Sequence, residues 1–345
     1  MSLSLDSGDL RVRVDQTDPA QWDLLLDLFK DASIYQSRPY GEVRWGKAQL
    51  SRMVLEHQDQ PVAIAQLRIV KVPMVKAGIA YLRWGPIWQR KDRPADPAVL
   101  KTMLAAMQRE YCDNRGLLLR ILPNLPEAFC EDCRPIFSEL GFEEKGEIYR
   151  TILLNLEPPP ETLRANLTKR WRRQLNTADK NALRIEAACD EAGFAAFQAL
   201  FDEMVARKAF DPGMDPQDFR KMQPLLPESQ KLHLLLCYSE EDPQPIAAIF
   251  CGLGGDTAIY LMGATGDKGL SLRGSYALHW RMINWLRERG ITWYDLNGYN
   301  PDKNPGTATF KEGFSGVDTR YPGPYEYASS AISRAAIAIM EKIRG

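Results

Sequence analysis

The hydrophobic positions of this chain follow two different periods. Residues 10–14 alternate between apolar and polar side chains, as a strand does, and residues 51–56, 61–70 and 80–83 read as further strands. Residues 21–30 and 99–114 instead place apolar side chains three or four positions apart, as a helix does. The alternation of strands and helices predicts an α/β (α+β) fold with mixed sheets.

One order of elements occurs twice. In the first half, helix 99–114 leads into strand 117–121, and a second helix ends at Leu140-Gly141-Phe142 before strand 148–154. In the second half, helix 274–289 leads into strand 293–296, and Gly313-Phe314 follows. A repeated order predicts two related modules.

The clearest break between the modules is Pro158-Pro159-Pro160, because consecutive prolines neither continue a helix nor donate to a strand ladder. We therefore predict an N-terminal domain over 1–156 and a C-terminal domain over 157–325. Beyond the break, a basic helix, a helix over 191–209 and three antiparallel strands at 232–238, 246–253 and 257–262 are expected. The tail 326–345 has helical spacing over 329–343, which predicts a helix that docks on the first domain.

Charge and cysteine content narrow the functional classes. The 44 basic and 45 acidic residues leave a net charge of -1, so nonspecific nucleic-acid binding is not expected from the chain as a whole. Cys130 and Cys133 form a single C-x-x-C, and with three histidines in total no zinc site is expected. We predict these two cysteines to be reduced thiols in a cytoplasmic protein. No N-terminal signal peptide or membrane-spanning run of about 20 apolar residues is apparent.

Polar groups collect where the strand 293–296 ends. Asp295 precedes Asn297-Gly298-Tyr299, and the open end of a sheet is where α/β folds bind ligands. Lys311 follows in the chain, and its ammonium could stabilise an oxyanion; the alternative is a solvated lysine paired with Glu312 or Asp295. Asp295 could orient Lys311 or accept a proton, or it could cap the turn by accepting backbone N–H groups.

Two arginines are candidates for phosphate binding, because a guanidinium matches phosphate oxygens with two parallel hydrogen bonds. Arg44 and Arg207 have nearby Glu42 and Glu203, so surface ion pairs are the alternative. The aromatic residues Tyr40, Trp84 and Tyr260 are expected at turns or strand ends, where they line a cleft or pack in the core.

Two further segments could meet an anion. Arg273 precedes a helix start, as in a pyrophosphate loop, but Ser271 stands where acetyl-CoA enzymes carry Arg or Gln, which argues against ordinary acetyl-CoA use. The basic residues 169–173 predict a solvated helix face, or a nucleic-acid contact in which Trp171 stacks on a base.

Six motifs in the same order resemble the Fem family of peptidoglycan interpeptide-bridge aminoacyltransferases over about residues 36–314. They are Gln36-Ser37 through Tyr40-Gly41 to Val43-Arg44, Gly85-Pro86, the basic helix after the linker, Arg207-Lys208, Tyr294-Asp295-Leu296 and Phe310-Lys311-Glu312-Gly313-Phe314. The resemblance implies two tandem GNAT-like domains.

The resemblance also implies an activity: transfer of an amino acid from aminoacyl-tRNA to an amine of a UDP-linked muropeptide or a lipid-linked cell-wall precursor. It places the precursor's diphosphate on Arg44 and Arg207 and Lys311 near the reacting groups. No cofactor besides the tRNA donor is expected, and the location would be the cytoplasm, with peripheral contact at the inner face of the membrane.

Two departures from the family pattern are visible. Leu122 stands where many members have Asp before proline, a carboxylate thought to serve the acceptor, and residues 168–184 are too few for the helical arm of some members. Two alternative functions stay open. One is an acyl-CoA- or acyl-carrier-dependent N-acyltransferase of envelope polysaccharide or lipid biosynthesis, and the other is a non-catalytic protein that binds the precursor.

Overall fold

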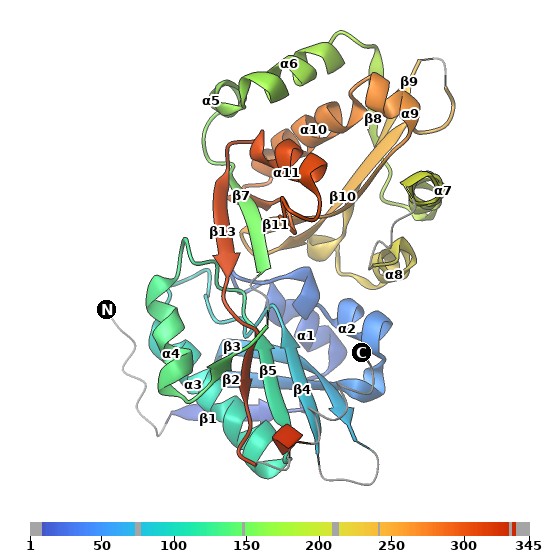
Figure 1. The fold of residues 1–345 in the computed structure, drawn as a ribbon. Helices are drawn as coiled ribbons and strands as arrows, with labels where there is room; N and C mark the ends of the chain where they lie inside the picture. Colours follow the sequence, from blue (N-terminus) through green and yellow to red (C-terminus); the bar gives the residue numbers. More distant parts are fainter. Residues whose placement is uncertain are drawn as a thin grey trace. The chain divides into compact units, whose positions relative to one another are not determined.

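A computed structural model describes residues 9–72, 77–146, 149–208, 214–240, 242–330 and 333–335. The chain divides into two compact units, Met1–Tyr149 with Arg320–Gly345 and Arg150–Thr319. Each unit holds one seven-stranded mixed sheet with helices packed against it (Figure 1). The predicted fold class, mixed sheets flanked by helices, is confirmed.

The sheet of the first unit has the order β1-β2-β3-β4-β5-β14-β6. Its only described parallel pair is β4 with β5, which runs from Ile79 opposite Leu118 to Arg83 opposite Leu122. The strands are β1 Leu10–Val14, β2 Leu50–His57, β3 Gln60–Lys71, β4 Gly78–Arg83, β5 Leu118–Leu122, β6 Glu143–Glu144 and β14 Tyr325–Tyr327. The helices are α1 Pro19–Leu26, α2 Arg38–Trp45, α3 Pro97–Met107 with a π-helical turn Gln108–Asn114, and α4 Arg134–Glu139.

Local sequence explains where three of these helices begin. Asp18, Ser37 and Asp96 each accept a hydrogen bond from a backbone N–H of the first turn, and each is followed within two residues by proline. A short polar side chain at the N-cap satisfies N–H groups that lack a helical partner, and proline has no N–H to satisfy there. The segment 38–45 therefore folds as helix α2.

The sheet of the second unit has the order β13-β7-β12-β11-β10-β9-β8, with α6 and α10 on one face and α7 and α8 on the other (Figure 1). The strands are β7 Tyr149–Asn155, β8 Leu183–Ala187, β9 His233–Ser239, β10 Ala247–Gly254, β11 Thr257–Thr265, β12 Trp293–Asp295 and β13 Val317–Tyr321. The helices are α5 Pro160–Asn166, α6 Lys169–Ala178, α7 Glu191–Lys208, α8 Pro216–Met222, α9 Asp267–Ser271, α10 Gly274–Glu288 and α11 Pro305–Glu312.

The two sheets have the same topology. In each, four strands are followed by a parallel neighbour, β5 beside β4 and β12 beside β11, and then by two more strands. This equivalence explains why one order of elements occurs twice in the sequence.

Two strands join the sheet of the other half of the chain. β7 follows β6 in sequence but pairs with β12, with Leu154 opposite Tyr294, while β14 follows β13 and lies between β5 and β6. The assignment of strand 148–154 to the first domain was therefore wrong. The segment Pro158-Pro159-Pro160 leads from β7 into α5 and lies inside the second unit. It is not the domain boundary, because strand pairing, and not a local break in the sequence, decides which sheet a strand joins.

The cysteines differ from expectation as well. Cys130 and Cys133 form a disulfide, with Cα atoms 5.4 Å apart, so the prediction of reduced thiols was wrong. The short helical turn Glu131–Cys133 brings the two Cα atoms into the range that a disulfide spans. Cys112, Cys189, Cys237 and Cys251 are free thiols.

The C-terminal tail is described through Ser330 and again over residues 333–335. The hydroxyls of Ser329 and Ser333 donate to the carbonyls of Cys112 and Gly116, so this part of the tail packs in the first unit. The rest of the predicted tail helix lies outside the described residues. Within those residues, no helix combines the length and apolarity that a bilayer crossing requires.

Candidate functional site

A fork between two parallel strands forms the centre of the candidate site in the second unit. β11 and β12 pair from Thr257 opposite Trp293 to Ile259 opposite Asp295, where β12 ends. β11 continues to Thr265, so Tyr260 is its first residue beyond the last pair. The carboxyl ends of parallel strands are where α/β sheets bind ligands.

Lys311 lies at this fork and is almost fully buried, with 6% of its surface exposed. From the last turn of α11, its Nζ donates to the carbonyls of Asn297 at 2.5 Å and Gly298 at 2.7 Å. Burial lowers the pKa of Lys311 to about 8, although the charge of Asp295 acts in the opposite direction. The alternative of a solvated lysine was wrong, and Glu312 instead accepts from the Tyr299 hydroxyl at 2.6 Å.

Asp295 ends β12 and is buried. Its Oδ1 accepts from the Thr151 hydroxyl at 2.5 Å and from the backbone N–H of Asn297 at 2.7 Å. The turn-capping alternative is therefore present. The same turn supplies the carbonyl oxygens that hold Lys311, so Asp295 fixes the backbone on which the ammonium rests.

Two aromatic rings complete the surroundings of Lys311. Its Nζ lies 5.9 Å from the centroid of Tyr260, and the Tyr260 ring lies 4.8 Å from that of His279 in an edge-on arrangement. Burial raises the pKa of Tyr260 to about 12 and lowers that of His279 to about 3, to which the charge of Lys311 adds. Both groups are therefore neutral at pH 7.

Sequence reasoning missed His279 and Thr151. His279 lies on α10 and contacts the hydroxyl of Tyr294 through Nδ1 at 3.2 Å. Its signal in the sequence was a histidine within an apolar helix, in a chain with only three histidines. Thr151 lies on β7, the strand that was assigned to the wrong sheet, so its contact with Asp295 could not be foreseen.

Arg207 and Arg273 lie beyond the fork. Arg207, in the last turn of α7, pairs with Asp267 at 2.5 Å and donates to the Thr265 carbonyl at 2.7 Å. Its ion pair is thus with Asp267 and not with the expected Glu203. Arg273 precedes α10 with a positive φ of 65° and donates from Nη1 to the Leu270 carbonyl at 2.6 Å. Diphosphate binding by Arg207 and anion binding by Arg273 stay predictions.

The remaining candidates belong to the first unit. Arg44 is exposed in the last turn of α2, and the neighbouring Glu42 pairs with Arg38 at 3.2 Å. Tyr40 and Trp84 are 2% and 4% exposed and both contact Tyr35, at ring-centroid distances of 5.1 and 6.0 Å. Their burial is what core packing predicts, and the roles of Arg44, Tyr40 and Trp84 in substrate binding stay predictions.

The basic segment 169–173 is a solvated helix face with a buried tryptophan. Lys169, Arg170 and Arg173 are exposed on α6, whereas Trp171 is 2% exposed and packs against Phe314 at a ring-centroid distance of 4.6 Å. The proposed stacking of Trp171 on a nucleic-acid base was wrong, because helical spacing turns this one side chain toward the core.

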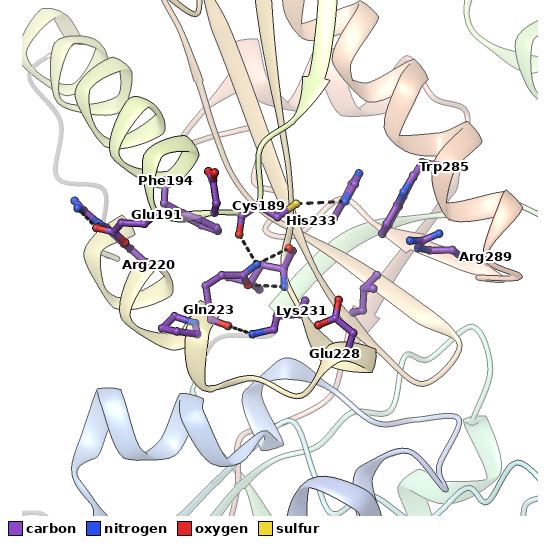
Figure 2. Close-up of a pocket in the computed structure, with 14 residues that line it drawn as sticks. Cys189, Glu191, Phe194, Arg220, Gln223, Glu228, Lys231, His233, Trp285 and Arg289 are labelled. Carbon is purple, nitrogen blue, oxygen red and sulfur yellow. Dashed lines mark hydrogen bonds and ion pairs between the residues drawn. The ribbon is translucent and has the colours of Figure 1, made fainter.

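A separate cavity of about 470 Å³ lies in the second unit (Figure 2). Apolar side chains such as Phe194, Leu232 and Trp285 line it, together with an ion pair of Arg220 with Glu191. None of the predicted site residues is among its lining residues.

Cys189 and His233 approach each other in this cavity, with Sγ 3.6 Å from Nδ1 (Figure 2). Burial raises the pKa of the Cys189 thiol. Burial also lowers the pKa of His233 to about 4, aided by Arg289 and Arg281. A protonated thiol beside a neutral imidazole is not an activated nucleophile, so the pair does not have the electrostatics of a cysteine-dependent active site. No group of three or more metal-ligating side chains occurs among the described residues.

Part of this chain is similar in sequence to known transferases. The model of the acetyltransferase (GNAT) domain family matches residues 163–312. The chain is 31% identical over 86 residues to the aminoacyltransferase FemA of Staphylococcus epidermidis, which is 24% of this chain and 21% of that relative. It is 28% identical over 105 residues to FemA of Staphylococcus aureus strain MW2, which is 29% of this chain and 25% of the relative. The matched stretches therefore span about a quarter or less of these relatives.

The fold of the whole chain is similar to the crystal structure of FemX. The two superpose with a TM-score of 0.79 over 95% of this chain and 100% of that one, at 16% sequence identity. A likeness at this identity is one of fold. Residues 163–312 thus match the acetyltransferase (GNAT) domain family, shorter stretches of the chain are similar to the FemA aminoacyltransferases, and the chain shares the fold of FemX.

Proposed function

We propose that this protein is an acyltransferase that moves an amino acid from aminoacyl-tRNA to an amine of a peptidoglycan precursor peptide. The observation that supports the proposal most is the buried Lys311 at the fork between β11 and β12. A lysine that is only 6% exposed loses hydration free energy, and ordinary surface packing gives no reason to bury it. The names of the FemA relatives agree with aminoacyl transfer.

The reaction needs alignment and a hydrogen-bond donor more than it needs a protein nucleophile. The amine nitrogen forms a bond to the ester carbonyl carbon of the donor, and the carbonyl oxygen becomes negative. The ester C–O bond then breaks, and the proton lost by the amine passes to the departing tRNA oxygen, which leaves as a hydroxyl. A protonated Lys311 has three N–H groups and uses two of them on the carbonyls of Asn297 and Gly298. The third is left for the developing oxyanion, in surroundings that contain little water.

Asp295 acts in this proposal as a positioning residue. Its carboxylate accepts the Asn297 N–H, and the carbonyl of Asn297 holds Lys311. Asp295 also supplies the negative charge that raises the pKa of Lys311 against the effect of burial. The ammonium therefore remains mostly protonated at pH 7.

The substrates would be held by cationic side chains. The exposed Lys169, Arg170 and Arg173 on α6 suit the phosphates of the acceptor end of tRNA, which non-specific cationic contacts bind. Arg44 and Arg207 are proposed to bind the diphosphate of a UDP-linked muropeptide. Both substrates are cytoplasmic, and the proposal places the reaction there.

A single-turnover transfer assay tests the proposal. Labelled aminoacyl-tRNAs are mixed with the protein and a UDP-linked muropeptide, and the labelled peptide is quantified. Transfer by the wild-type protein that falls in Lys311→Met supports the proposal. No transfer with any aminoacyl-tRNA would contradict it.

A thermal-shift comparison identifies the alternative in that case. A ligand that binds only the folded state raises the unfolding temperature. Stabilisation by acetyl-CoA and not by the muropeptide would indicate the acyl-CoA-dependent transferase, which the GNAT domain match also allows. Stabilisation by the muropeptide without any transfer would indicate a precursor-binding protein.

A further inference from the structure

Arg83 lies among tyrosines at the end of β4. Its guanidinium carbon is 4.3 Å from the ring centroid of Tyr35 and 5.9 Å from that of Tyr40. Both rings are almost fully buried, at 2% exposure, and the Trp84 ring stacks on Tyr35 with the centroids 6.0 Å apart. The aromatic contacts hold the guanidinium in one place and shield part of it, including Nε, from water.

No carboxylate of the described residues forms an ion pair with Arg83. Its Nε is buried without a hydrogen-bond partner, and the guanidinium makes no ion pair within the described part of the chain. Other arginines of the same unit that are buried or half-buried do pair: Arg38 with Asp23 at 2.9 Å, and Arg90 with Asp92 at 2.8 Å. A buried guanidinium N–H without an acceptor is unfavourable, so an acceptor supplied from outside would be bound with a net gain.

The position in the sheet is that of a ligand site. Arg83 opposite Leu122 is the last pair of the parallel strands β4 and β5, and the Trp84 N–H donates to the Leu122 carbonyl at 2.7 Å. The equivalent parallel pair of the second unit ends at the fork where Lys311 lies. Arg83 as a whole is half-buried, so a solute can reach part of its side chain.

We propose that Arg83 is an oxyanion-binding residue that holds a phosphoryl or carboxylate group of a ligand at the carboxyl end of β4. A guanidinium forms two parallel hydrogen bonds with either group. The identity of the ligand that carries this group rests on the proposed function, because a UDP-linked muropeptide contains both a diphosphate and free carboxylates. Arg83 thereby adds a contact in the first unit to the predicted Arg44.

Isothermal titration calorimetry on the full chain tests the site without any transfer reaction. The probes are UDP for the phosphoryl group, and alanyl-alanine with its C-terminal amide for the carboxylate. The variants are Arg83→Met, which keeps an apolar stem without charge, and Arg83→Lys, which keeps a charge without the planar fork. Arg11→Met is the matched control, because Arg11 is an exposed arginine on β1 of the same unit. All titrations are run well below the unfolding temperature of each variant.

We expect the wild-type protein to bind one of two probes. It binds UDP if the site holds a phosphoryl group, or it binds alanyl-alanine but not the alanyl-alanine amide if the site holds a carboxylate. Arg83→Met should weaken this binding about 10- to 100-fold, as loss of a charged hydrogen bond does, while Arg83→Lys weakens it less and Arg11→Met leaves it unchanged. Dependence of UDP binding on Arg83 identifies the phosphoryl group, and dependence of alanyl-alanine binding identifies the carboxylate.

The proposal is overturned if Arg83→Met binds each probe as the wild type does, or if no probe binds at millimolar concentration. It is also overturned if the loss of binding in Arg83→Lys and Arg83→Met follows the decrease in their unfolding temperatures, because Arg83 would then have a structural role. These outcomes are distinct from failure of the proposed function. Transfer with an unchanged KM in Arg83→Met would contradict the oxyanion site but support the proposed function. Binding that depends on Arg83, without any transfer, would support the oxyanion site but contradict the proposed function.

Discussion

At the scale of single residues, the most consequential feature is a lysine held by backbone carbonyls. Lys311→Met keeps the length and most of the packing of the side chain and removes the charge. We expect turnover to fall about 10²- to 10³-fold, as losses of oxyanion donors do. Precursor affinity should fall much less, because the negative charge develops in the transition state. The measurement is single-turnover transfer, with the exposed Lys180→Met as the control; equal rates in Lys311→Met and the wild type would remove the catalytic role.

The same lysine makes stability depend on pH in a defined direction. Its pKa in the folded protein is about 8, below the ordinary value of 10.5. Between these values the unfolded chain binds a proton that the folded chain has lost, so the free energy of unfolding of the wild type rises with pH relative to Lys311→Met. The rise should total about 3 kcal/mol between pH 8 and 10.5. Urea unfolding of both proteins at the two pH values measures it, and parallel behaviour would show that Lys311 is not buried as described.

Two buried histidines make the free energy of unfolding depend on pH in the acidic range. The pKa of His233 is lowered to about 4 and that of His279 to about 3, from 6.5. Below pH 6.5 the unfolded chain binds protons that the folded chain does not, so the free energy of unfolding falls as the pH falls. Between pH 6 and 4, His233 contributes up to about 1.4 kcal/mol per pH unit to this fall in the free energy of unfolding. The variant His233→Gln should lack that contribution. If urea unfolding showed the wild-type dependence in this variant, the neutral state of His233 would be incorrect.

At the scale of elements, the end of α11 depends on a close approach between a glycine and a tryptophan. A Cβ added at Gly313 would lie 2.3 Å from Cδ1 of Trp171, a distance that no carbon pair tolerates. Gly313→Ala should therefore lower the free energy of unfolding by about 1 to 3 kcal/mol, the range for overpacking a core. Gly306→Ala is the matched control, because the same helix leaves open space at that position. Thermal or urea unfolding of both variants decides; equal stability would contradict the packing of α11 on α6.

Most elements were predictable from local sequence. The predicted strand 10–14 has the same two ends as β1, and the helix predicted from residue 274 begins where α10 begins. This agreement is expected because alternation and helical spacing are local properties. Helix α2 was not predicted, since its short polar-aromatic sequence has no clear apolar stripe and its stability comes from the Ser37 cap and from burial of Tyr40. Propensity is overridden by tertiary contacts in such segments.

At the scale of the whole molecule, each sheet is completed by a strand from the other half of the chain. Tyr325 on β14 lies opposite Ile121 and Glu144, and its ring stacks on Phe137 at 4.2 Å. Removal of residues 320–345 should therefore destabilise the first unit by at least about 3 kcal/mol, the scale of losing one large buried aromatic side chain.

Hydrogen exchange can show that this truncation destabilises the first unit and not the second. Amide protons of β5 should lose protection in the truncated chain, whereas those of β9 and β10 in the second unit should keep it. A chain that ends at Ala335 is the control, because it retains β14 and the Ser333 contact. Unchanged protection of β5 after removal of residues 320–345 would show that β14 does not complete this sheet.

The sequence by itself determined the mixed α/β class, the doubled order of elements and the family resemblance, and it predicted a candidate site at the end of strand 293–296. It could do so because periodicity, turn residues and motifs are local properties of the sequence. The tertiary structure alone decided which sheet β7 and β14 join, that Trp171 faces the core, that Lys311 is buried on the carbonyls of Asn297 and Gly298, and that Thr151 and His279 belong to the same surroundings. These facts depend on pairs of residues far apart in the chain. Strand pairing and burial are set by such long-range contacts, and no local pattern specifies them.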